Sequence, residues 1–515
     1  MLTSLKSFFK SKTNGLSFLA GLVLVFAYAP FSQWWLTLVI LPLWLALIDK
    51  SSVKTASQAS FSFGLGWFIS GISWVHVSID QFGGMPLPVS LLLMLLLCIY
   101  LALFPLLAGY LASRFSRDKQ LNIALFAPIW LFTEYLRSVV LTGFPWLSLG
   151  YSQMDSPLNT LAPVIGEIGI TAYILAISVV LIKVIQQANN RVGWAMCFIV
   201  LSSMIWLSSQ FSWTQPTGET TKVALVQGNI DQAIKWDQEQ EWPTMLLYLE
   251  LSRANYDADI IVWPESAIPS LEPMTQDYLD LVNQSAAVNN SAIITGILDY
   301  DFQTKSYYNS LITLGKSRED SSLEGDYFYN HTNRFYKHHL LPIGEFVPFG
   351  EFLRPLAPFF NLPMSSFSRG NYVQQNLVAK GKHLLPLICF EIAFPNQLAA
   401  NLTPQTQLLL TVSNDAWFGT SHGPDQHMEI ARMRALEFGR PLLRSTNTGI
   451  TAAVDHKGQF IARIPQFEQQ VLKADIMLVE GNTPYSIYGN VPVYILALLS
   501  LLLTRFFPSK ETVNE

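Results

Sequence analysis

The chain has 515 residues, of which 50% are apolar and only 13% are charged. Soluble proteins carry about 25% charged residues, so this chain is too apolar to be soluble throughout. The net charge of −5 argues against nucleic acid as a partner. Charged residues are sparse over 1–212 and frequent over 220–480, which predicts a membrane domain, a polar domain and a C-terminal helix at 488–507.

Eight segments have the length and composition of membrane-spanning helices, which need about 20 mostly apolar residues. Seven precede the polar domain and one follows it. They lie near 15–32, 34–48, 61–79, 88–113, 122–142, 162–186, 193–211 and 488–507. The first also resembles a cleaved secretory signal ending at Ala29, an alternative that Pro30 at the next position disfavours.

Basic residues occur in alternate loops, which predicts the orientation of the spans. The loops around 30–34, 80–87 and 143–160 contain no Lys or Arg. The basic positions are Lys6, Lys10, Lys12, Lys50, Lys54, Arg114, Arg117, Lys119, Arg191, Arg505 and Lys510. This pattern places both termini in the cytoplasm and residues 213–487 outside it. Within the fifth span, Glu134 and Arg137 are expected to pair with each other or with neighbours inside the bundle.

The polar domain alternates short apolar runs with helical stretches, which predicts an α/β layered fold. Buried strands are expected at 223–226, 260–263, 292–295 and 408–411. Helices are expected at 238–254, 274–288 and 425–438. The polar stretches 213–220 and 480–487 are expected to be linkers to the membrane domain.

Cys389 is the one cysteine of the polar domain, since Cys98 and Cys197 lie in apolar segments. It follows the apolar run 384–388 and is a candidate nucleophile. A thiol attacks as the thiolate, so a base must take its proton, and Glu265 after the run 260–263 is the candidate. Lys337 would then face the oxyanion of a tetrahedral intermediate, oriented by Glu345.

Each of these residues also has an ordinary explanation. A lone Cys at a strand end is commonly packing, a Trp-Pro-Glu triplet can be a turn, and Lys337 can be a surface cation. The adjacent His338 and His339 invite a metal site, but no set of ligands at suitable spacing joins them, so no metal or cofactor is expected. The catalytic interpretation rests on the three residues together, in one domain.

At these residues the polar domain resembles the nitrilase (carbon–nitrogen hydrolase) superfamily, whose Glu–Lys–Cys triad lies on a four-layer αββα sandwich. With seven spans before it and one after, the chain resembles the apolipoprotein N-acyltransferase family over nearly its whole length. The strings that carry the resemblance are SWVHVS (73–78), FGGMP (82–86), LTGFPW (141–146), VQGNI (226–230), WPESA (263–267), SNDAWFG (413–419) and RPLLRSTNTG (440–449).

The resemblance implies that Glu265 is the base, Lys337 the stabiliser of the intermediate and Cys389 the nucleophile. Supporting or substrate-binding roles are expected for further residues in the matching strings and around the nucleophile. These residues are Trp236, Trp263, Glu345, Phe390, Glu391, Asn414 and Trp417. Glu391 would share a face with Cys389 if the chain were extended there. The family often has Tyr where this chain has Phe390, so a hydroxyl needed there would require another donor.

The implied reaction is ping-pong acyl transfer through a Cys389 thioester, the final step of lipoprotein maturation. The donor would be a phospholipid, typically phosphatidylethanolamine, and the acceptor the α-amine of a diacylglyceryl-cysteine apolipoprotein. The resemblance implies a bacterial inner-membrane enzyme with its catalytic domain on the periplasmic side. A monomer is expected, although the sequence does not show the oligomeric state. Apolar segments 356–360 and 362–364 form either a lid at the membrane interface or a core loop.

Two other function classes remain open from the sequence. A membrane-tethered amidase or nitrilase would use the same triad with water as the acceptor. A transporter or a lipoprotein-binding scaffold would need no triad, but intramembrane charges are too sparse for a relay along the spans. Substitution of Cys389 separates the classes, because it would inactivate either enzyme and leave a scaffold working.

Overall fold

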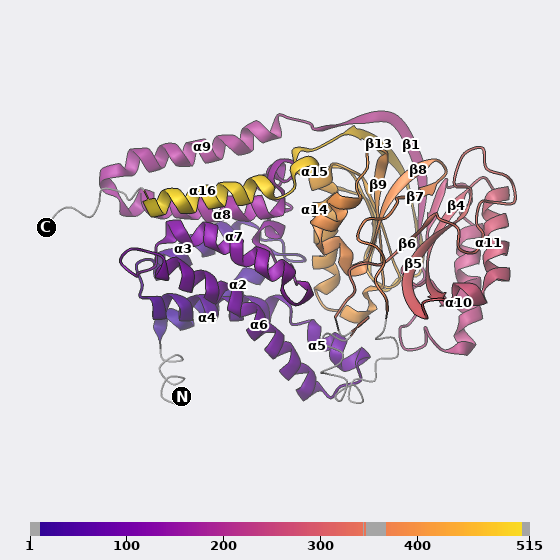
Figure 1. The fold of residues 1–515 in the computed structure, drawn as a ribbon, viewed down its shortest axis with the longest axis horizontal. Helices are drawn as coiled ribbons and strands as arrows, with labels where there is room; N and C mark the ends of the chain where they lie inside the picture. The colour runs from indigo at the N-terminus through magenta and orange to yellow at the C-terminus, as the bar shows by residue number, and fades with distance from the viewer. Residues whose placement is uncertain (1–10, 343, 347–366, 507–515) are drawn as a thin grey trace. The chain divides into compact units, whose positions relative to one another are not determined.

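The computed structural model describes residues 11–342, 344–346 and 367–506. Internal contacts divide the chain into two compact units (Figure 1). The first contains the residues up to His76, Met85–Ser212 and the residues from Tyr488 on, and the second contains Val77–Gly84 and Trp213–Ile487. Each unit is described by itself below.

The first unit is helical, as expected. Among the described residues, each of the eight predicted apolar segments contains a helix. The main helices are α2 (Lys12–Leu24) with η1 (Val25–Ala27), α3 (Trp35–Ile48), α4 (Val53–Gly71), α6 (Leu87–Arg114), α7 (Ile123–Val139), α8 (Ala162–Gln186), α9 (Arg191–Ser209) and α16 (Val491–Phe506).

Four helical segments within the described ranges are long and apolar enough to cross a membrane. They are Leu87–Arg114, Ile123–Thr142, Pro157–Gln186 and Ala188–Ser209. A fifth is obtained if Val53–Gly71 and Val75–Phe82, bent by 57° at a break, count as one span. The helices Lys12–Ala27, Trp35–Ile48 and Val491–Thr504 are apolar but shorter, and at 1.5 Å per residue they fall below the roughly 30 Å of a hydrocarbon core. Eight spans therefore remain a prediction.

The third predicted segment, 61–79, differs from the structure at both ends. α4 begins at Val53 and ends at Gly71, and a short π-helix, η2 (Ser78–Phe82), follows α5 (Val75–Val77). The helix stops where Gly71 and Ser73 offer poor helix propensity, and Ile72 leaves the helical region with φ −120° and ψ 23°. Residues Val77–Gly84 belong to the second unit, which hydropathy does not reveal.

The expected pairing of Glu134 with Arg137 on α7 is confirmed. Both side chains are buried and form an ion pair. The Arg137 guanidinium also donates to the carbonyls of Phe144 and Trp146, at 2.6 and 2.7 Å. The pair therefore holds the LTGFPW string in place, because a buried charge is retained only where its donors are satisfied.

The second unit contains two β-sheets. One has the order β13-β1-β2-β4-β5-β6 with β3 paired to β4, and the other has the order β12-β11-β10-β9-β8-β7. The strands of the first are β1 (Thr214–Gln227), β2 (Ile260–Val262), β3 (Ile268–Leu271), β4 (Ala292–Asp301), β5 (Ser306–Gly315), β6 (Arg334–Tyr336) and β13 (Gln470–Gly481). Those of the second are β7 (Leu377–Ala379), β8 (Lys382–Ile388), β9 (Thr406–Ser413), β10 (Leu442–Thr446), β11 (Thr451–Val454) and β12 (Phe460–Ile464).

Alternating side chains build the layers of this unit. In β1, Val223 and Leu225 enter a core shared with Leu408 and Leu410 of the other sheet. The intervening Ala224 packs with residues of the helices α10 (Gln238–Arg253) and α11 (Gln276–Val288). Because both faces of these strands are buried, they are continuous apolar runs. Figure 1 shows α10 and α11 beyond one sheet and α14 (Gly423–Phe438) beyond the other, the four-layer arrangement expected from the sequence.

Strand direction brings several strand ends to one edge. β1, β2 and β4 are parallel, and β6 has the direction of β4 because each is antiparallel to β5. In the second sheet β8, β9 and β10 are parallel. The residues that follow β2, β6, β8 and β9 are therefore carried at carboxyl ends of strands.

The first predicted linker is mostly strand, and the second holds the end of a strand and most of a short helix, which corrects the sequence analysis. β1 begins at Thr214 and β13 continues to Gly481, and Thr214 pairs with Gly481. The polar residues of 214–220 lie in an exposed ribbon, so they lack the apolar pattern that marks the buried half of β1. After β13, α15 (Pro484–Tyr488) follows within the second predicted linker.

Gly296 in β4 tests how closely the sheet packs on the turn after β2. A Cβ at Gly296 would lie 2.6 Å from the Pro264 carbonyl oxygen and 2.8 Å from the Cα of Glu265. Gly296→Ala should therefore lower the free energy of unfolding by about 1–3 kcal/mol, measured by thermal unfolding in detergent. Gly15→Ala, with no atom within 4 Å of the added Cβ, is the control and should not destabilise. Equal stability of Gly296→Ala and wild type would contradict this packing.

Candidate active site

Glu265 follows β2 and has a buried carboxylate. Its Oε1 accepts hydrogen bonds from Asn309 Nδ2 at 2.8 Å and from Lys337 Nζ at 3.3 Å. Its Oε2 accepts from the backbone N–H of Asn414 at 3.1 Å, which follows β9 of the other sheet. The carboxylate thus joins the edges of both sheets, and only 8% of the residue is exposed.

Lys337 follows β6 and lies between two carboxylates. Besides Glu265, its Nζ contacts the Oε1 and Oε2 of Glu345 at 2.9 and 2.8 Å. Asn309 Nδ2 bridges the two acids, since it also donates to Glu345 Oε1 at 3.0 Å, and the Leu341 N–H donates to Glu345 Oε2 at 2.8 Å. The orienting contact expected from Glu345 to Lys337 is present. Burial alone would lower the pKa of Lys337, but Glu265 and Glu345 raise it well above its ordinary value.

Cys389 follows β8 and begins the 3-10 turn η9 (Cys389–Ala393). Its φ of 54° is in the left-handed region, which a non-glycine residue adopts only where its surroundings hold it. Burial raises the pKa of its thiol, the charge of Glu265 raises it further, and Lys337 opposes both. Cys389 is therefore a thiol at rest, and it would need a base to act as the predicted nucleophile.

Glu391 does not share a face with Cys389, because the chain turns at Cys389 instead of remaining extended. Its buried carboxylate accepts from the backbone N–H groups of His338 at 2.8 Å, His339 at 3.0 Å and Ile388 at 2.9 Å. Gln397 Nε2 donates to it as well, at 2.7 Å. Burial raises the pKa of Glu391, against these hydrogen bonds. The residue joins the chain beside Lys337 to the chain beside Cys389.

The ring of Phe390 is buried beside the nucleophile. Its centroid lies 5.8 Å from that of His339 and 5.1 Å from that of Phe394. Phe390 thus packs in an aromatic group instead of supplying a polar atom. The imidazoles of the histidine pair are engaged separately, since His338 Nδ1 lies 2.7 Å from the Gly370 carbonyl and His339 stacks on Phe394.

Of two tryptophans expected at the site, Trp263 lies in the core and Trp236 lies beside Lys235. Trp263 is fully buried in the core beneath α10, where its Nε1 donates to Ser252 Oγ at 2.8 Å. Although Trp263 lies near Glu265 in sequence, its ring does not surround the Glu265 carboxylate. Trp236 precedes α10 and is 39% exposed, and its ring contacts the ammonium of Lys235.

Lys235 and Asn309 are site residues that sequence reasoning missed. The Lys235 ammonium is buried and donates to the main-chain carbonyl of Glu265 at 3.2 Å. Burial lowers the pKa of Lys235 to about 8, against the opposing effect of Glu265. Neither residue belongs to a pattern that separates it from a surface polar group, although Lys235 adjoins Trp236.

A second buried polar group lies behind the nucleophile. Asp415 accepts hydrogen bonds from Ser413 Oγ and from the Arg444 guanidinium, both at 2.7 Å. His427 lies between Asp415 Oδ1, at 3.1 Å, and the Cys389 carbonyl, at 3.2 Å. Burial raises the pKa of Asp415, but Arg444 and His427 outweigh it and hold the pKa well below its usual range. Asp415 thus remains a carboxylate that fixes the turn carrying Cys389.

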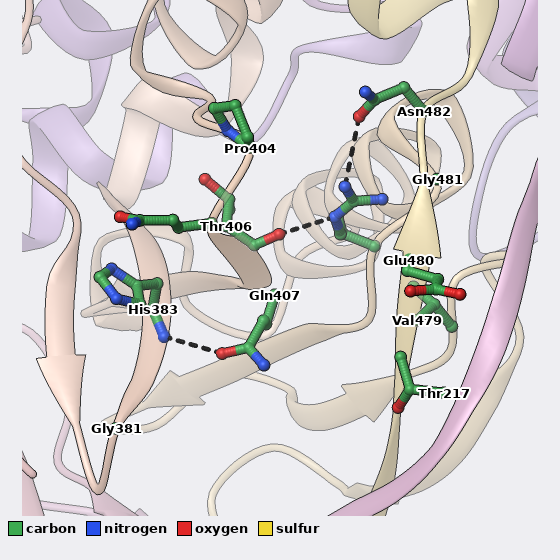
Figure 2. Close-up of a pocket in the computed structure, with 12 residues that line it drawn as sticks. Thr217, Gly381, His383, Pro404, Thr406, Gln407, Val479, Glu480, Gly481 and Asn482 are labelled. Carbon is green, nitrogen blue, oxygen red and sulfur yellow. Dashed lines mark hydrogen bonds between the residues drawn. The ribbon is translucent and has the colours of Figure 1, made fainter.

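A hollow of about 430 Å³ lies elsewhere in this unit (Figure 2). It is lined by residues at the amino ends of β8 and β9, including His383 and Gln407, and by Arg440, whose Nε donates to the Thr406 carbonyl at 2.8 Å. Cys389 and Asn414 follow the carboxyl ends of the same two strands. The hollow is therefore at the opposite edge of the sheet and contributes nothing to the site. The predicted lid segments, 356–360 and 362–364, lie outside the described residues.

Comparison with known proteins places the chain in a family. Residues 20–180 match the apolipoprotein N-acyltransferase N-terminal domain, and residues 222–482 match the carbon–nitrogen hydrolase family. An apolipoprotein N-acyltransferase of Shewanella oneidensis is 48% identical over 517 residues, covering 98% of each chain. The chain belongs to the apolipoprotein N-acyltransferase family. The apolipoprotein N-acyltransferase of Haemophilus influenzae is 41% identical to this chain, and the match covers 98% of this chain and 96% of the other.

Two solved structures that resemble this chain cover only part of it. A carbon–nitrogen hydrolase from Helicobacter pylori has a TM-score of 0.36 and 14% identity, and covers 50% of this chain and 89% of its own. The nitrilase-superfamily protein Nit3 of Saccharomyces cerevisiae has a TM-score of 0.36 and 17% identity, covering 53% and 95%. The two-sheet α/β architecture expected from the sequence agrees with the carbon–nitrogen hydrolase match.

Glu391→Gln tests whether the buried carboxylate holds the two chains together. The amide would direct N–H groups at the backbone donors, so unfolding should become easier by about 2–3 kcal/mol and the rate of Cys389 alkylation should change. Thermal unfolding and a thiol-reactive probe measure the two effects. Glu219→Gln, at an exposed acid, is the control and should be neutral. If Glu391→Gln changes neither the melting temperature nor the rate of Cys389 alkylation, the hydrogen bonds of Glu391 do not hold the two chain segments together.

Lys235→Met tests the buried ammonium through pH. The pKa of Lys235, about 8, lies below the roughly 10.4 of an unfolded chain, so the unfolded state binds more protons between these values. Burial of the Lys235 ammonium therefore lowers the free energy of unfolding by its full amount below pH 8. This destabilisation disappears as the pH approaches 10.5. The melting temperature of Lys235→Met relative to wild type should therefore be higher at pH 7 than at pH 10, with a free-energy change of at most about 2–3 kcal/mol. The exposed Lys473→Met should show no such trend, and a trend absent from Lys235→Met would contradict the pKa.

Proposed function

We propose that this enzyme transfers an acyl chain from a phospholipid to the α-amine of the N-terminal diacylglyceryl-cysteine of apolipoproteins, through a Cys389 thioester. The observation that carries the proposal is the buried contact of Glu265 with Lys337 at the strand ends, with the Cys389 thiol within range of both charges. The similarity to apolipoprotein N-acyltransferases over nearly the whole chain supports the choice of substrates.

The first half-reaction forms the thioester. Glu265 takes the thiol proton, and the Cys389 sulfur attacks the ester carbonyl of the phospholipid. The oxyanion of the tetrahedral intermediate faces the Lys337 ammonium. Collapse breaks the bond to the glycerol oxygen, which takes the proton back from Glu265 and leaves as the alcohol of a lysophospholipid.

The second half-reaction transfers the acyl chain to nitrogen. The neutral α-amine attacks the thioester carbonyl and passes a proton to Glu265. The intermediate again places its oxyanion at Lys337, and collapse breaks the carbon–sulfur bond. The proton on Glu265 returns to the sulfur, so the products are an amide and the resting thiol. No step needs a metal or a redox partner, because each bond change is balanced by one proton on Glu265.

The proposal includes a topology. Eight spans with both termini in the cytoplasm would place residues 213–487 on the periplasmic side of the inner membrane, as the alternation of basic loops predicts. In α9 no residue is buried and many apolar side chains are exposed, which supports contact with lipid. We propose a monomer with phosphatidylethanolamine as the donor. Both lipid substrates lie in the bilayer to which the catalytic domain is tethered, which raises their effective concentration at the site.

Intact mass measurement tests the proposal directly. Purified protein is incubated with a phospholipid of known acyl composition, denatured and weighed beside Cys389→Ala. Wild type should gain one acyl residue that hydroxylamine removes, and Cys389→Ala should gain none. Addition of a diacylglyceryl-cysteine peptide should then remove the adduct and yield the N-acylated peptide.

Other outcomes point to the rival functions. Release of free fatty acid or ammonia without transfer to the peptide would favour a hydrolase that uses water as its acceptor. Absence of both adduct and product, with the protein folded, would favour a scaffold. An adduct that persists in Cys389→Ala would place the nucleophile elsewhere.

A further inference from the structure

Residues Val77–Gly84 form part of the second unit, although their neighbours in sequence on both sides belong to the first. The segment contains η2 (Ser78–Phe82) and overlaps the strings SWVHVS and FGGMP. The proposed reaction assigns no task to either string. The contacts of this segment within the second unit indicate one.

The segment packs on the short helix η10 (Asp415–Phe418) by three kinds of contact. Ser78 Oγ donates a hydrogen bond to the Trp417 carbonyl at 2.6 Å. The ring of Phe82 meets that of Trp417 edge to face, with centroids 5.3 Å apart. Gly419, with φ 56°, approaches so closely that a Cβ there would lie 2.9 Å from Val77 Cγ1.

The hydrogen bond from Ser78 satisfies a group that the helix itself leaves open. The last carbonyls of a helix have no intrahelical donor, and η10 has only four residues. The Trp417 carbonyl therefore needs a donor from outside the turn. A serine hydroxyl on η2 supplies it, and the adjoining aromatic contact fixes the side chain of the same residue.

η10 is connected both to the proposed base, Glu265, and to the proposed nucleophile, Cys389. It begins directly after Asn414, whose N–H donates to Glu265 Oε2 at 3.1 Å. Its first residue, Asp415, contacts His427, which reaches the Cys389 carbonyl at 3.2 Å. A shift of η10 would therefore change the hydrogen bonding of the base and the support of the nucleophile together.

We propose that the segment Ser78–Phe82 is a positioning element for the turn 414–417, and that it sets the hydrogen bond from Asn414 to Glu265. The inference rests on the proposed function, because it takes Glu265 as the base. Ser78 and Phe82 touch no reacting atom in this arrangement. They act through Trp417. This residue is expected at the site because it lies in the SNDAWFG string, and here its role is to position the turn.

Ser78→Ala tests the inference by the rate of Cys389 thioester formation across pH, measured by intact mass with a defined phospholipid. Loss of the hydroxyl should slow acylation about tenfold at neutral pH. The acidic limb of the pH–rate profile should move to higher pH, because a carboxylate that loses a hydrogen bond is less favoured in its ionised form. Ser78→Thr retains the hydroxyl and should restore both properties.

Two further variants separate positioning from folding. Ser421→Ala removes a hydroxyl that donates to the Phe418 carbonyl at 2.7 Å and accepts from the Gly423 N–H at 3.2 Å, and it should leave rate and pH profile unchanged. Phe82→Leu keeps apolar volume without the ring and should shift the profile in the same direction as Ser78→Ala. Melting temperatures are measured for every variant.

The outcomes distinguish this inference from the proposed function. If wild type forms no thioester, the proposed function fails before the positioning question arises, and the inference falls with it. If wild type is acylated and Ser78→Ala matches it in rate and pH profile, the inference is wrong. A slower Ser78→Ala with an unchanged pH profile and a lowered melting temperature also overturns it, because the segment then serves folding alone.

Discussion

The site depends on one buried ammonium held between two carboxylates. A single carboxylate would form a closed pair with Lys337, and Glu265 would be a poor base because its charge would be neutralised. Glu345 shares the cation, and Asn309 donates to both acids, so Glu265 keeps an unshared excess of negative charge. Burial, and with it the negative charge of Glu265, raises the pKa of the Cys389 thiol, which keeps the thiol protonated at rest. In the proposed reaction the same arrangement therefore prepares the base and restrains the nucleophile.

The proposed reaction conserves the charge of this cluster. At rest, Glu265 and Glu345 are negative, Lys337 is positive and the thiol is neutral. In the tetrahedral intermediate Glu265 is neutral and the oxyanion is negative, so the total is unchanged and one negative charge has moved across Lys337. Burial makes net charge costly, and a reaction that only relocates charge around a fixed cation needs little reorganisation. Rigid placement then becomes the main requirement.

Hydrogen bonds to backbone groups supply that placement. Glu391 binds the N–H of His338, which follows Lys337, and the N–H of Ile388, which precedes Cys389. One buried carboxylate thus connects the chain at the cation to the chain at the nucleophile. His427 and Asp415 support the Cys389 carbonyl from the opposite side, where the left-handed backbone requires external constraint.

The sequence predicts the strands and the triad order because both follow from local patterns. Runs such as 223–226 and 408–411 are mostly apolar and buried on both faces, and Glu265 and Cys389 follow such runs, whereas Lys337 follows the short strand Arg334–Tyr336. What it does not predict depends on pairing between distant segments. The polar half of β1 forms a strand because it pairs with β13. Lys235 is buried because it packs against Glu265, which is distant in sequence. Helix α4 ends eight residues before the predicted apolar segment 61–79 ends, and nothing local assigns Val77–Gly84 to the polar domain.

The triad alone does not decide between acyl transfer and hydrolysis. Glu265 would accept a proton from water as readily as from an amine, and the oxyanion would meet Lys337 in either case. Tethering both lipids to one bilayer gives effective concentrations in the millimolar range, far below that of water itself. Concentration cannot therefore select the amine, and the thioester must be kept from water by the surroundings of Cys389. The partial burial of Cys389, the aromatic group around Phe390 and the contacts of the turn 414–417 each act in that direction.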